Sequence, residues 1–352
     1  MSGYKIKFNG VDRLYDAFSW RLTRRAKKVW ESGNVLQGQY LNQLESEVAK
    51  KYNRKYAVAV ASATDGLYFA LKAAKVEKDD FVICPALSYT ATAGAIKRIR
   101  ANIDFVDVDK IGNIDVTKIP NVGKPKVLLY VNLFGNTAEY DTLRKICDAR
   151  NITLIEDAAQ SQGAKYKKHL SGTLGDISVF SFDPMKNMPS FGGGGMVLTD
   201  NKDYYDYIKS IRRHGFGSNM QYGHNSLISE DHCNQLLLIL SKFDKLQKMR
   251  QKVFERYKNN LPMIKFIESN KESDSSFHKL VALVDNRSQL QKYLAENGIE
   301  TKIHYGQTLD PKNRYLNADI FCHTALSLPI YPYLLDKEID YICDKIKKFY
   351  NV

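Results

Sequence analysis

Lys186 is the residue whose type and position most clearly suggest chemistry. It follows a short apolar run at residues 180–182 and stands in a segment with few other charges. A lysine that is removed from water has a lowered pKa, so its free amine can attack a carbonyl and form a Schiff base. A solvated loop lysine is the competing interpretation, because Lys and Arg together number 52 in this chain.

Asp157 stands at the end of a second apolar run, residues 152–155. Ligands of parallel α/β sheets bind beyond the carboxyl ends of the strands, so a carboxylate at this place is well positioned to contact one. The alternative is that Asp157 caps a following helix, a role worth about 1 kcal/mol. The local sequence leaves both interpretations open.

Small and hydroxyl-bearing residues at positions 61–67 mark a junction between a strand and a helix. The free N–H groups and the dipole of a helix N-terminus can bind an anion there, although Thr64 could also serve only as the N-cap. Four glycines at 192–195 permit close backbone approach, with a simple hairpin or bulge as the alternative. A strand follows these glycines, so neither dinucleotide nor P-loop fingerprint is present.

The elements that must position these residues alternate between short apolar strands and amphipathic helices. This alternation predicts an α/β fold with a mostly parallel sheet covered on both faces. Strands are expected at 56–60, 82–84, 103–106, 127–133, 152–155, 177–182 and 196–198, and helices at 65–74, 91–99 and 140–149.

The pattern changes after about residue 235. A long helix at 236–253 is followed by a loop-rich segment at 264–276, weaker strands at 279–284 and 302–304, and a helix at 337–350. We therefore expect a large domain at 1–235 and a smaller α+β domain at 236–352.

The formal net charge of +13 favours either a nucleic-acid surface or a pocket for an anionic small molecule. The best basic patch, residues 21–28, has no nucleic-acid-binding motif beside it, so we expect no nucleic-acid partner. Five scattered cysteines without a C-x-x-C pair argue against disulfides, and neither they nor the His232-Cys233 pair predicts a metal site. No apolar run reaches the length of a membrane span, and we expect a reduced, cytoplasmic protein.

Taken in order and spacing, the four segments resemble pyridoxal-phosphate aminotransferases of fold type I, and more narrowly the nucleotide-sugar aminotransferases of the DegT/DnrJ/EryC1/StrS family. The resemblance extends from residues 33–38, similar to the family's "SGxxxxG", to residues 326–332, similar to its "LSLPxxP". It implies a mostly parallel central sheet between helices and a smaller C-terminal domain.

The resemblance implies roles for the cofactor-binding residues. Lys186 falls where the family's lysine forms a Schiff base with pyridoxal 5′-phosphate, and Asp157 where a carboxylate pairs with the pyridine nitrogen. Gln160 is placed beside the ring, near the phenolic oxygen. The phosphate is expected at Ser181, Ala63 and Thr64.

Further positions concern the ring, the subunit interface and the substrate. Tyr89 is similar to an aromatic residue that stacks on the ring, and Asn225 to an asparagine that reaches the phosphate of the neighbouring subunit in a homodimer with shared active sites. His304 and Tyr305 match an "HY" pair before a substrate loop. Two positions depart from the family: Leu227 replaces a frequent Arg, and Gly193 replaces the usual acidic residue.

The resemblance implies transfer of an amino group from L-glutamate to a nucleotide-linked keto-deoxy-sugar, through pyridoxamine phosphate. The spacing from Lys186 to Gly192 is similar to that of enzymes acting at a 3-keto carbon, which favours a dTDP- or UDP-linked 3-keto hexose. The alternatives are a 4-keto-sugar aminotransferase and a non-catalytic, basic nucleic-acid-binding or regulatory protein on the same fold. The implied pathway makes amino sugars for secondary metabolites or for surface polysaccharides such as the lipopolysaccharide O-antigen.

Overall fold

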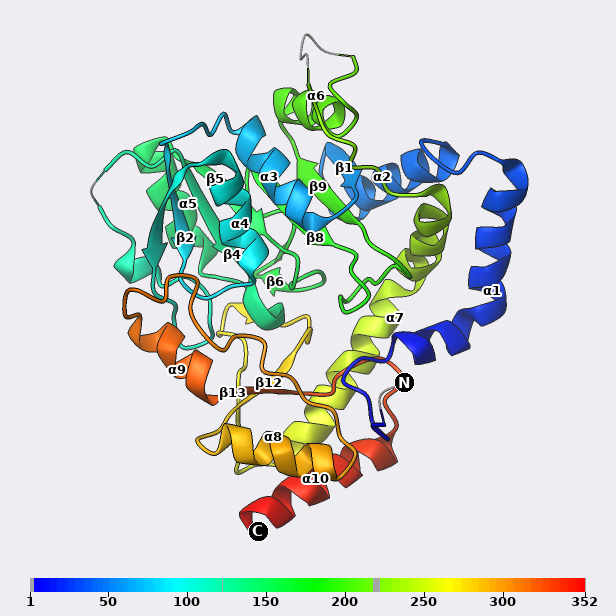
Figure 1. The fold of residues 1–352 in the computed structure, drawn as a ribbon, viewed down its shortest axis with the longest axis vertical. Coiled ribbons are helices and arrows are strands. Elements are labelled where there is room, and N and C mark those ends of the chain that lie inside the picture. Colours follow the sequence, from blue (N-terminus) through cyan, green and yellow to red (C-terminus); the bar gives the residue numbers. More distant parts are fainter. Residues whose placement is uncertain (1–2, 122, 218–221, 352) are drawn as a thin grey trace.

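A seven-stranded sheet forms the centre of the larger part of the protein (Figure 1). The computed structural model describes residues 3–121, 123–217 and 222–351. The strands are β1 (Tyr56–Val60), β2 (Phe81–Pro85), β3 (Asn102–Val106), β4 (Val127–Val131), β5 (Thr153–Asp157), β8 (Ile177–Ser181) and β9 (Gly195–Thr199). They stand in the order β1-β9-β8-β5-β4-β2-β3, and β9 runs antiparallel to both neighbours while the other pairs are parallel. The predicted α/β architecture with a mostly parallel sheet is therefore confirmed.

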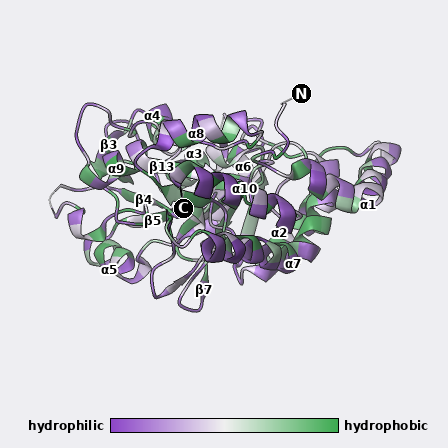
Figure 2. Cartoon of the chain, turned by 90° about the horizontal axis from the view of Figure 1, so that it is seen from below, coloured by the Kyte–Doolittle hydropathy of each residue, from purple (hydrophilic) through white to green (hydrophobic). Residues whose placement is uncertain are grey.

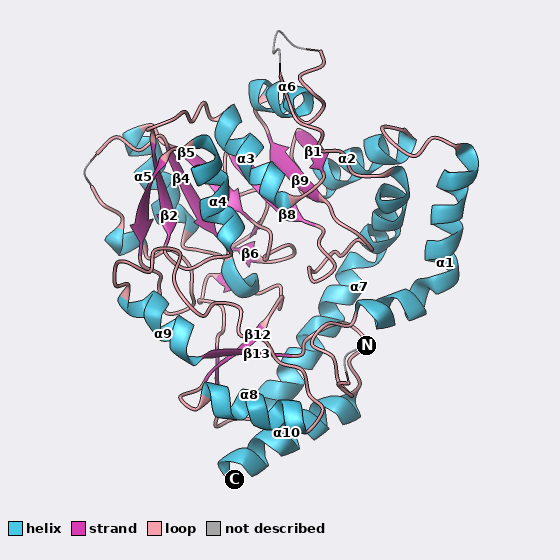
Figure 3. Ribbon diagram, viewed as in Figure 1, coloured by secondary structure: helices cyan, strands magenta, loops and turns pink. Residues whose placement is uncertain are grey.

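Helices cover both faces of this sheet (Figure 3). One face packs against α3 (Ala63–Ala73), α4 (Thr90–Ile99) and α6 (Lys202–Ile211), and the other against α2 (Gln39–Lys51), α5 (Tyr140–Arg150) and α7 (Glu230–Asn260). Side chains alternate along a strand, so Val58 and Val60 point to the first face while Ala57 and Ala59 point to the second. Burial on both faces explains why these strands are apolar throughout.

The helix α7 leads from the large sheet to a smaller antiparallel sheet (Figure 1). That sheet has the order β10 (Lys265–Phe266), β12 (Leu280–Leu283) and β13 (Ala325–Leu328), and α8 (Arg287–Glu296), α9 (Leu316–Thr324) and α10 (Asp336–Tyr350) accompany it. α10 buries side chains three and four residues apart (Ile339, Ile342, Cys343, Ile346), and its outer face is hydrophilic (Figure 2). A third small sheet joins β6 (Lys165–Tyr166), β7 (His169–Leu170) and β11 (Ser273–Asp274).

Most predicted elements differ from the structure by one or two residues at an end, and three differences have a clear physical reason. The strand expected at 302–304 is wrong: Lys302 makes a single bridge to Ser327 and no named strand forms there. β4 ends at Val131 instead of 133, because residues Leu133–Gly135 turn as a short 3-10 helix in which Phe134 has a φ of 59°. α7 begins at Glu230, ahead of the predicted start at 236. The prediction began too late because the first residues of this helix are mostly polar and show no helical apolar period. The predicted boundary at 235/236 lies inside this helix, and the division into two domains stays a prediction.

The two ends of the chain are joined through α1 (Val11–Ser32). The Arg13 guanidinium donates to both carboxylate oxygens of Glu338 on α10, at 2.6 Å each. Arg13 also donates to the carbonyl of Tyr333 at 3.1 Å. Such a two-pronged pair fixes orientation as well as distance.

In the three described ranges, every helix falls short of the length and apolar character that a membrane crossing requires. A polar contact joins two of the described helices. It involves Glu230, which is buried at the start of α7. Its carboxylate accepts hydrogen bonds from the backbone N–H groups of Gly38, Tyr40 and Leu41, at 2.8–2.9 Å, and so caps the N-terminus of α2.

Replacing Glu230 by Ala should lower the free energy of unfolding by about 2–4 kcal/mol, because it leaves buried N–H groups without an acceptor. Chemical denaturation measures this loss. The control is Glu47→Ala, which removes an exposed carboxylate from α2 itself and should change the free energy of unfolding by less than about 0.5 kcal/mol. Equal effects of the two substitutions would show that the cap does not stabilise α2.

Candidate active site

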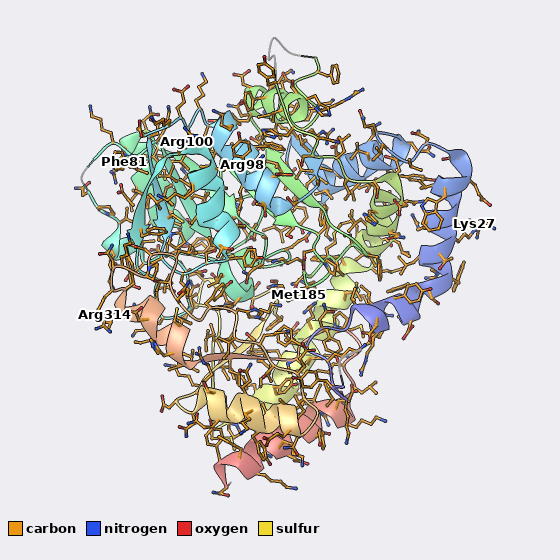
Figure 4. The ribbon with its side chains drawn as sticks, viewed as in Figure 1. Lys27, Phe81, Arg98, Arg100, Met185 and Arg314 are labelled. Carbon is orange, nitrogen blue, oxygen red and sulfur yellow. The ribbon has the colours of Figure 1, made fainter. Side chains whose placement is uncertain are left out.

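A cavity of about 370 Å³ opens at the carboxyl ends of β5 and β8, within the size range of small-molecule pockets. Both parts of the protein line it. From the large sheet and its connections come Ala63, Thr64, Tyr89, Asp157, Gln160, Ser181 and Lys186, and from the smaller part come His278, Lys279, His304 and Tyr305. Met185, next to Lys186, lies between the two parts (Figure 4). Ligand binding beyond the carboxyl ends of parallel strands fits this placement.

Lys186 lies in the turn that follows β8. Its backbone N–H donates to the carbonyl of Asp183 at 2.9 Å, and the Asp183 carboxylate accepts from the Met185 N–H at 2.8 Å. Burial lowers the pKa of Lys186, while the carboxylates of Asp157 and Asp183 oppose this shift. Among the described residues, no side chain holds its Nζ in a hydrogen bond or ion pair. The amine is thus available to a ligand in the cavity.

Asp157 ends β5 with a side chain that is 5% exposed. Its carboxylate accepts hydrogen bonds from Thr92 Oγ1 at 3.0 Å and from the Ala159 N–H at 3.2 Å. Burial raises the pKa of Asp157, and these two donors and the Lys186 amine partly offset the rise. No helix follows Asp157, so the interpretation of this residue as a helix N-cap is wrong.

The neighbouring carboxylate, Glu156, points to the opposite face of the sheet and is fully buried. It accepts hydrogen bonds, all 2.7–3.0 Å long, from Asn132, Ser171, Gly172, Leu174 and Ser178. Glu156 therefore serves the scaffold, while Asp157 faces the cavity.

Gln160 connects the two sides of the cavity. Its amide nitrogen donates to the hydroxyl of Tyr305 at 2.8 Å, and its carbonyl accepts from the Phe134 N–H at 3.2 Å. His304 lies beside Tyr305, and burial, together with the nearby Lys279, lowers the pKa of His304 to about 2. His304 is therefore a neutral imidazole at physiological pH.

The N-terminus of α3 forms another wall of the cavity. The N-cap is Ser62, whose hydroxyl accepts from the Asp65 N–H at 3.1 Å, so the alternative role of Thr64 as N-cap is wrong. Thr64 is exposed and lines the cavity, together with half-buried Ala63 and buried Ser181. The first N–H groups of a helix have no acceptor within the helix, which makes this end suited to an anion. Gly193 and Gly194 line the same region of the cavity, and their lack of a side chain lets a ligand approach the backbone closely.

Two predicted residues lie at the margin or outside. Tyr89 is 64% exposed and lines the cavity at the N-cap of α4. Asn225 is exposed, pairs with Arg213 in a single bridge and does not line the cavity of its own chain. Leu227 also lies outside this cavity.

Sequence reasoning assigned no role to several cavity residues, among them the polar residues Thr92, His278 and Lys279. Thr92 follows Tyr89 by three positions in the first turn of α4. Residues three apart lie on the same side of a helix, so the hydroxyl of Thr92 was the available signal in the sequence. His278 and Lys279 form a polar pair directly before the apolar strand β12, which was the available signal for them. As for metals, the described residues contain no group of three or more His, Cys, Asp or Glu side chains placed to hold an ion.

Replacing Thr92 by Val keeps the shape of the side chain and removes its hydrogen bond to Asp157. This bond stabilises the charged carboxylate, so its loss should raise the pKa of Asp157 further. An NMR titration of aspartate carboxyl carbons measures the shift. Ser88→Ala is the matched control, because Ser88 bonds to Thr92 and not to Asp157. An Asp157 pKa that is unchanged in Thr92→Val would contradict the assignment.

The comparisons with known proteins agree with this geometry. The sequence profile of the DegT/DnrJ/EryC1/StrS aminotransferase family matches residues 20–347. The "pleiotropic regulatory protein" of Geobacillus stearothermophilus is 30% identical, with 97% of each chain covered. The UDP-2-acetamido-2-deoxy-3-oxo-D-glucuronate aminotransferase of Pseudomonas aeruginosa is 31% identical, with 90% of this chain and 92% of that protein covered.

A solved structure agrees over the whole length. The crystal structure of DesV from S. venezuelae in complex with a ketimine intermediate has a TM-score of 0.93 at 26% identity, and 98% of each chain is covered. The matched residues include the sheet that carries Asp157, the turn that carries Lys186 and the smaller part that carries His304. The chain belongs to the DegT/DnrJ/EryC1/StrS aminotransferase family.

Proposed function

We propose that this protein transfers an amino group from L-glutamate to the keto group of a nucleotide-linked deoxy-sugar. As a member of this family, it is a pyridoxal-phosphate-dependent aminotransferase of fold type I that acts on nucleotide sugars. The observation that carries the proposal is the meeting of Lys186 and Asp157 at one cavity: Asp157 ends β5, and Lys186 lies in the turn after the neighbouring strand β8. The donor, the nucleotide and the carbon that receives the amine belong to the proposal.

The residues around the cavity fit the cofactor by their chemistry. The unpaired amine of Lys186 suits an aldehyde, and the buried carboxylate of Asp157 suits the protonated nitrogen of the pyridine ring. The phosphate would bind at the N-terminus of α3, with the hydroxyls of Thr64 and Ser181. Gln160 would lie beside the ring, where Tyr305 already holds its amide.

Bound pyridoxal phosphate supplies an electron sink for a carbanion at the carbon that carries the amine. The chain's residues move and hold the protons. Because burial favours the neutral amine of Lys186, its Nζ can take the proton from the α-carbon of the donor and return a proton in the second half of the cycle. The Asp157 carboxylate, which Thr92 and Ala159 orient, would hold a proton on the nitrogen of the bound pyridine ring.

Several features support the finer parts of the proposal. The P. aeruginosa relative is named for a 3-oxo sugar linked to UDP, which is in keeping with the 3-keto preference inferred from the Lys186–Gly192 spacing. Asn225 is exposed and outside its own cavity, which suits contact with the phosphate in a second copy of the chain. We therefore propose a homodimer with shared sites, which makes amino sugars for larger glycans or secondary metabolites.

The second candidate is a regulatory, nucleic-acid-binding protein. One relative is named a pleiotropic regulatory protein, and in this chain exposed Trp20 lies in a basic groove with Arg21, Arg24, Arg25 and Lys28. Neither observation requires Lys186 or Asp157, so an aminotransferase explains more of the structure. Binding to generic DNA that weakens steeply with salt would favour the regulatory candidate.

Lys186→Ala should lower the rate of amino transfer at least about a hundredfold, because it removes the group that moves the proton. Borohydride reduction of the wild type, followed by peptide mapping, should find the cofactor fixed to Lys186. Lys145→Ala removes an exposed lysine of α5 and should leave both results unchanged. Labelling at another lysine, or near wild-type turnover in Lys186→Ala, would contradict the assignment.

Wild-type protein with glutamate and a panel of dTDP-, UDP- and GDP-linked 3-keto and 4-keto sugars should aminate the 3-keto compounds. NMR of the product locates the new amine. An amine found only at carbon 4 would overturn the 3-keto preference while leaving the aminotransferase in place. Failure with every keto-sugar in the panel would contradict the proposed substrate class.

A further inference from the structure

The cavity contains a second lysine, Lys279, for which the proposed reaction has no use. It directly precedes β12 and lines the cavity with Lys186 and His304. Its Nζ lies 4.9 Å from the centroid of the Phe8 ring, and it forms no ion pair with any carboxylate of the described residues. Burial, reinforced by the nearby charges of Lys186 and Arg250, lowers the pKa of Lys279 well below its usual value.

The lack of an ion pair distinguishes Lys279 from several arginines whose side chains are also little exposed. Arg212 pairs with Glu45, Arg54 with Asp200 and Arg144 with Asp176. Asp183, the acid that most favours the charged form of Lys279, is itself exposed. A cation that is largely removed from water costs stability unless an anion or several acceptors compensate it. Among the described residues, no carboxylate pairs with Lys279 to supply that anion.

His304 adds a hydrogen-bonding group beside this lysine. Its Nε2 is buried and has no hydrogen-bond partner among the described residues, and its ring packs edge-on against Phe8 at 5.5 Å between centroids. The ring is neutral, so the tautomer with a proton on Nε2 can donate one hydrogen bond. His278 is different: its Nδ1 faces the amide oxygen of Asn187 at 3.0 Å and must donate, which leaves its Nε2 an acceptor unsuited to an anion.

We propose that Lys279 and His304 form a subsite for a substrate carboxylate, on the side of the cavity built by the smaller part of the protein. The inference rests on the proposed function, since the anion belongs to a substrate of that reaction. The carboxylate is either that of the donor amino acid, which is attached to the reacting carbon, or that of a uronic-acid sugar. A carboxylate fits better than a nucleotide diphosphate, because the subsite adjoins Lys186 and the diphosphate lies a sugar ring away from the reacting carbon.

The test is a calorimetric binding series with the cofactor-loaded protein and two pairs of unreactive probes. Glutarate and glutaramide share a carbon chain and differ in charge, and UDP-glucuronate and UDP-glucose differ in one carboxylate. Lys279→Met should weaken binding of the carboxylate member of at least one pair about tenfold or more, and change the neutral members less than about twofold. Lys292→Met, which removes an exposed lysine from α8, should leave all four dissociation constants within about twofold of the wild type.

The outcome for each pair identifies the source of the carboxylate. A loss confined to glutarate assigns the subsite to the amino donor, and a loss confined to UDP-glucuronate assigns it to the sugar. A wild type that binds both members of each pair equally well, or a Lys279→Met variant with unchanged discrimination, overturns the proposal. If Lys279→Met fails to fold or to hold the cofactor, His304→Phe carries the same test, because it keeps the ring and removes the donor.

The proposed function fails on different evidence. A wild type that does not transfer the amine from glutamate to any nucleotide keto-sugar would contradict that function. A charge-dependent difference in glutarate binding would still establish the subsite in such a protein.

Discussion

A charge that is removed from water needs a partner, and this constraint organises the protein around its cavity. Glu156 meets it with donors from five residues, and Glu230 with three backbone N–H groups at the start of α2. Arg212 meets it with Glu45 and the carbonyl of Ala59. These satisfied groups are distant in sequence from their partners, so each one fixes separate segments to the same scaffold.

The groups that face the cavity are less completely satisfied. Glu156 and Asp157 are adjacent on β5, yet the first has a full set of donors and the second has two. Lys186 and Lys279 have no ion-pair partner among the described residues, and burial lowers the pKa of each. The difference separates structural charges from those available to a ligand. A cofactor and its substrates can therefore contribute to stability by completing these contacts.

Sequence alone predicted the parts of this arrangement that depend on local pattern. Continuous apolar runs located the strands of the large sheet, and the ends of two of them pointed to Asp157 and Lys186. Thr92 and Lys279 were missed, because the signals in the sequence, a hydroxyl in the first turn of α4 and a polar pair before β12, gain their significance only from contacts with distant residues. The strand expected at 302–304 did not form, since this segment has a single apolar residue, Ile303, and so short a segment can be a bridge or a strand depending on its neighbours. The assignment of Ser62 as the cap of α3 likewise required backbone geometry.

The contact between Arg13 and Glu338 also has a consequence for biosynthesis. These residues are 325 positions apart in the chain, and the parallel bridge from Ile6 to Ile299 spans a similar length. A ribosome that adds roughly 5–20 residues per second needs about 15–65 s to make that stretch. During this interval Arg13 has no Glu338 to pair with. The large sheet, whose strands end at Thr199, can form first, and the cavity residues of the smaller part, from His278 to Tyr305, are added later. The pair between Arg13 and Glu338 forms only after α10 has been synthesised.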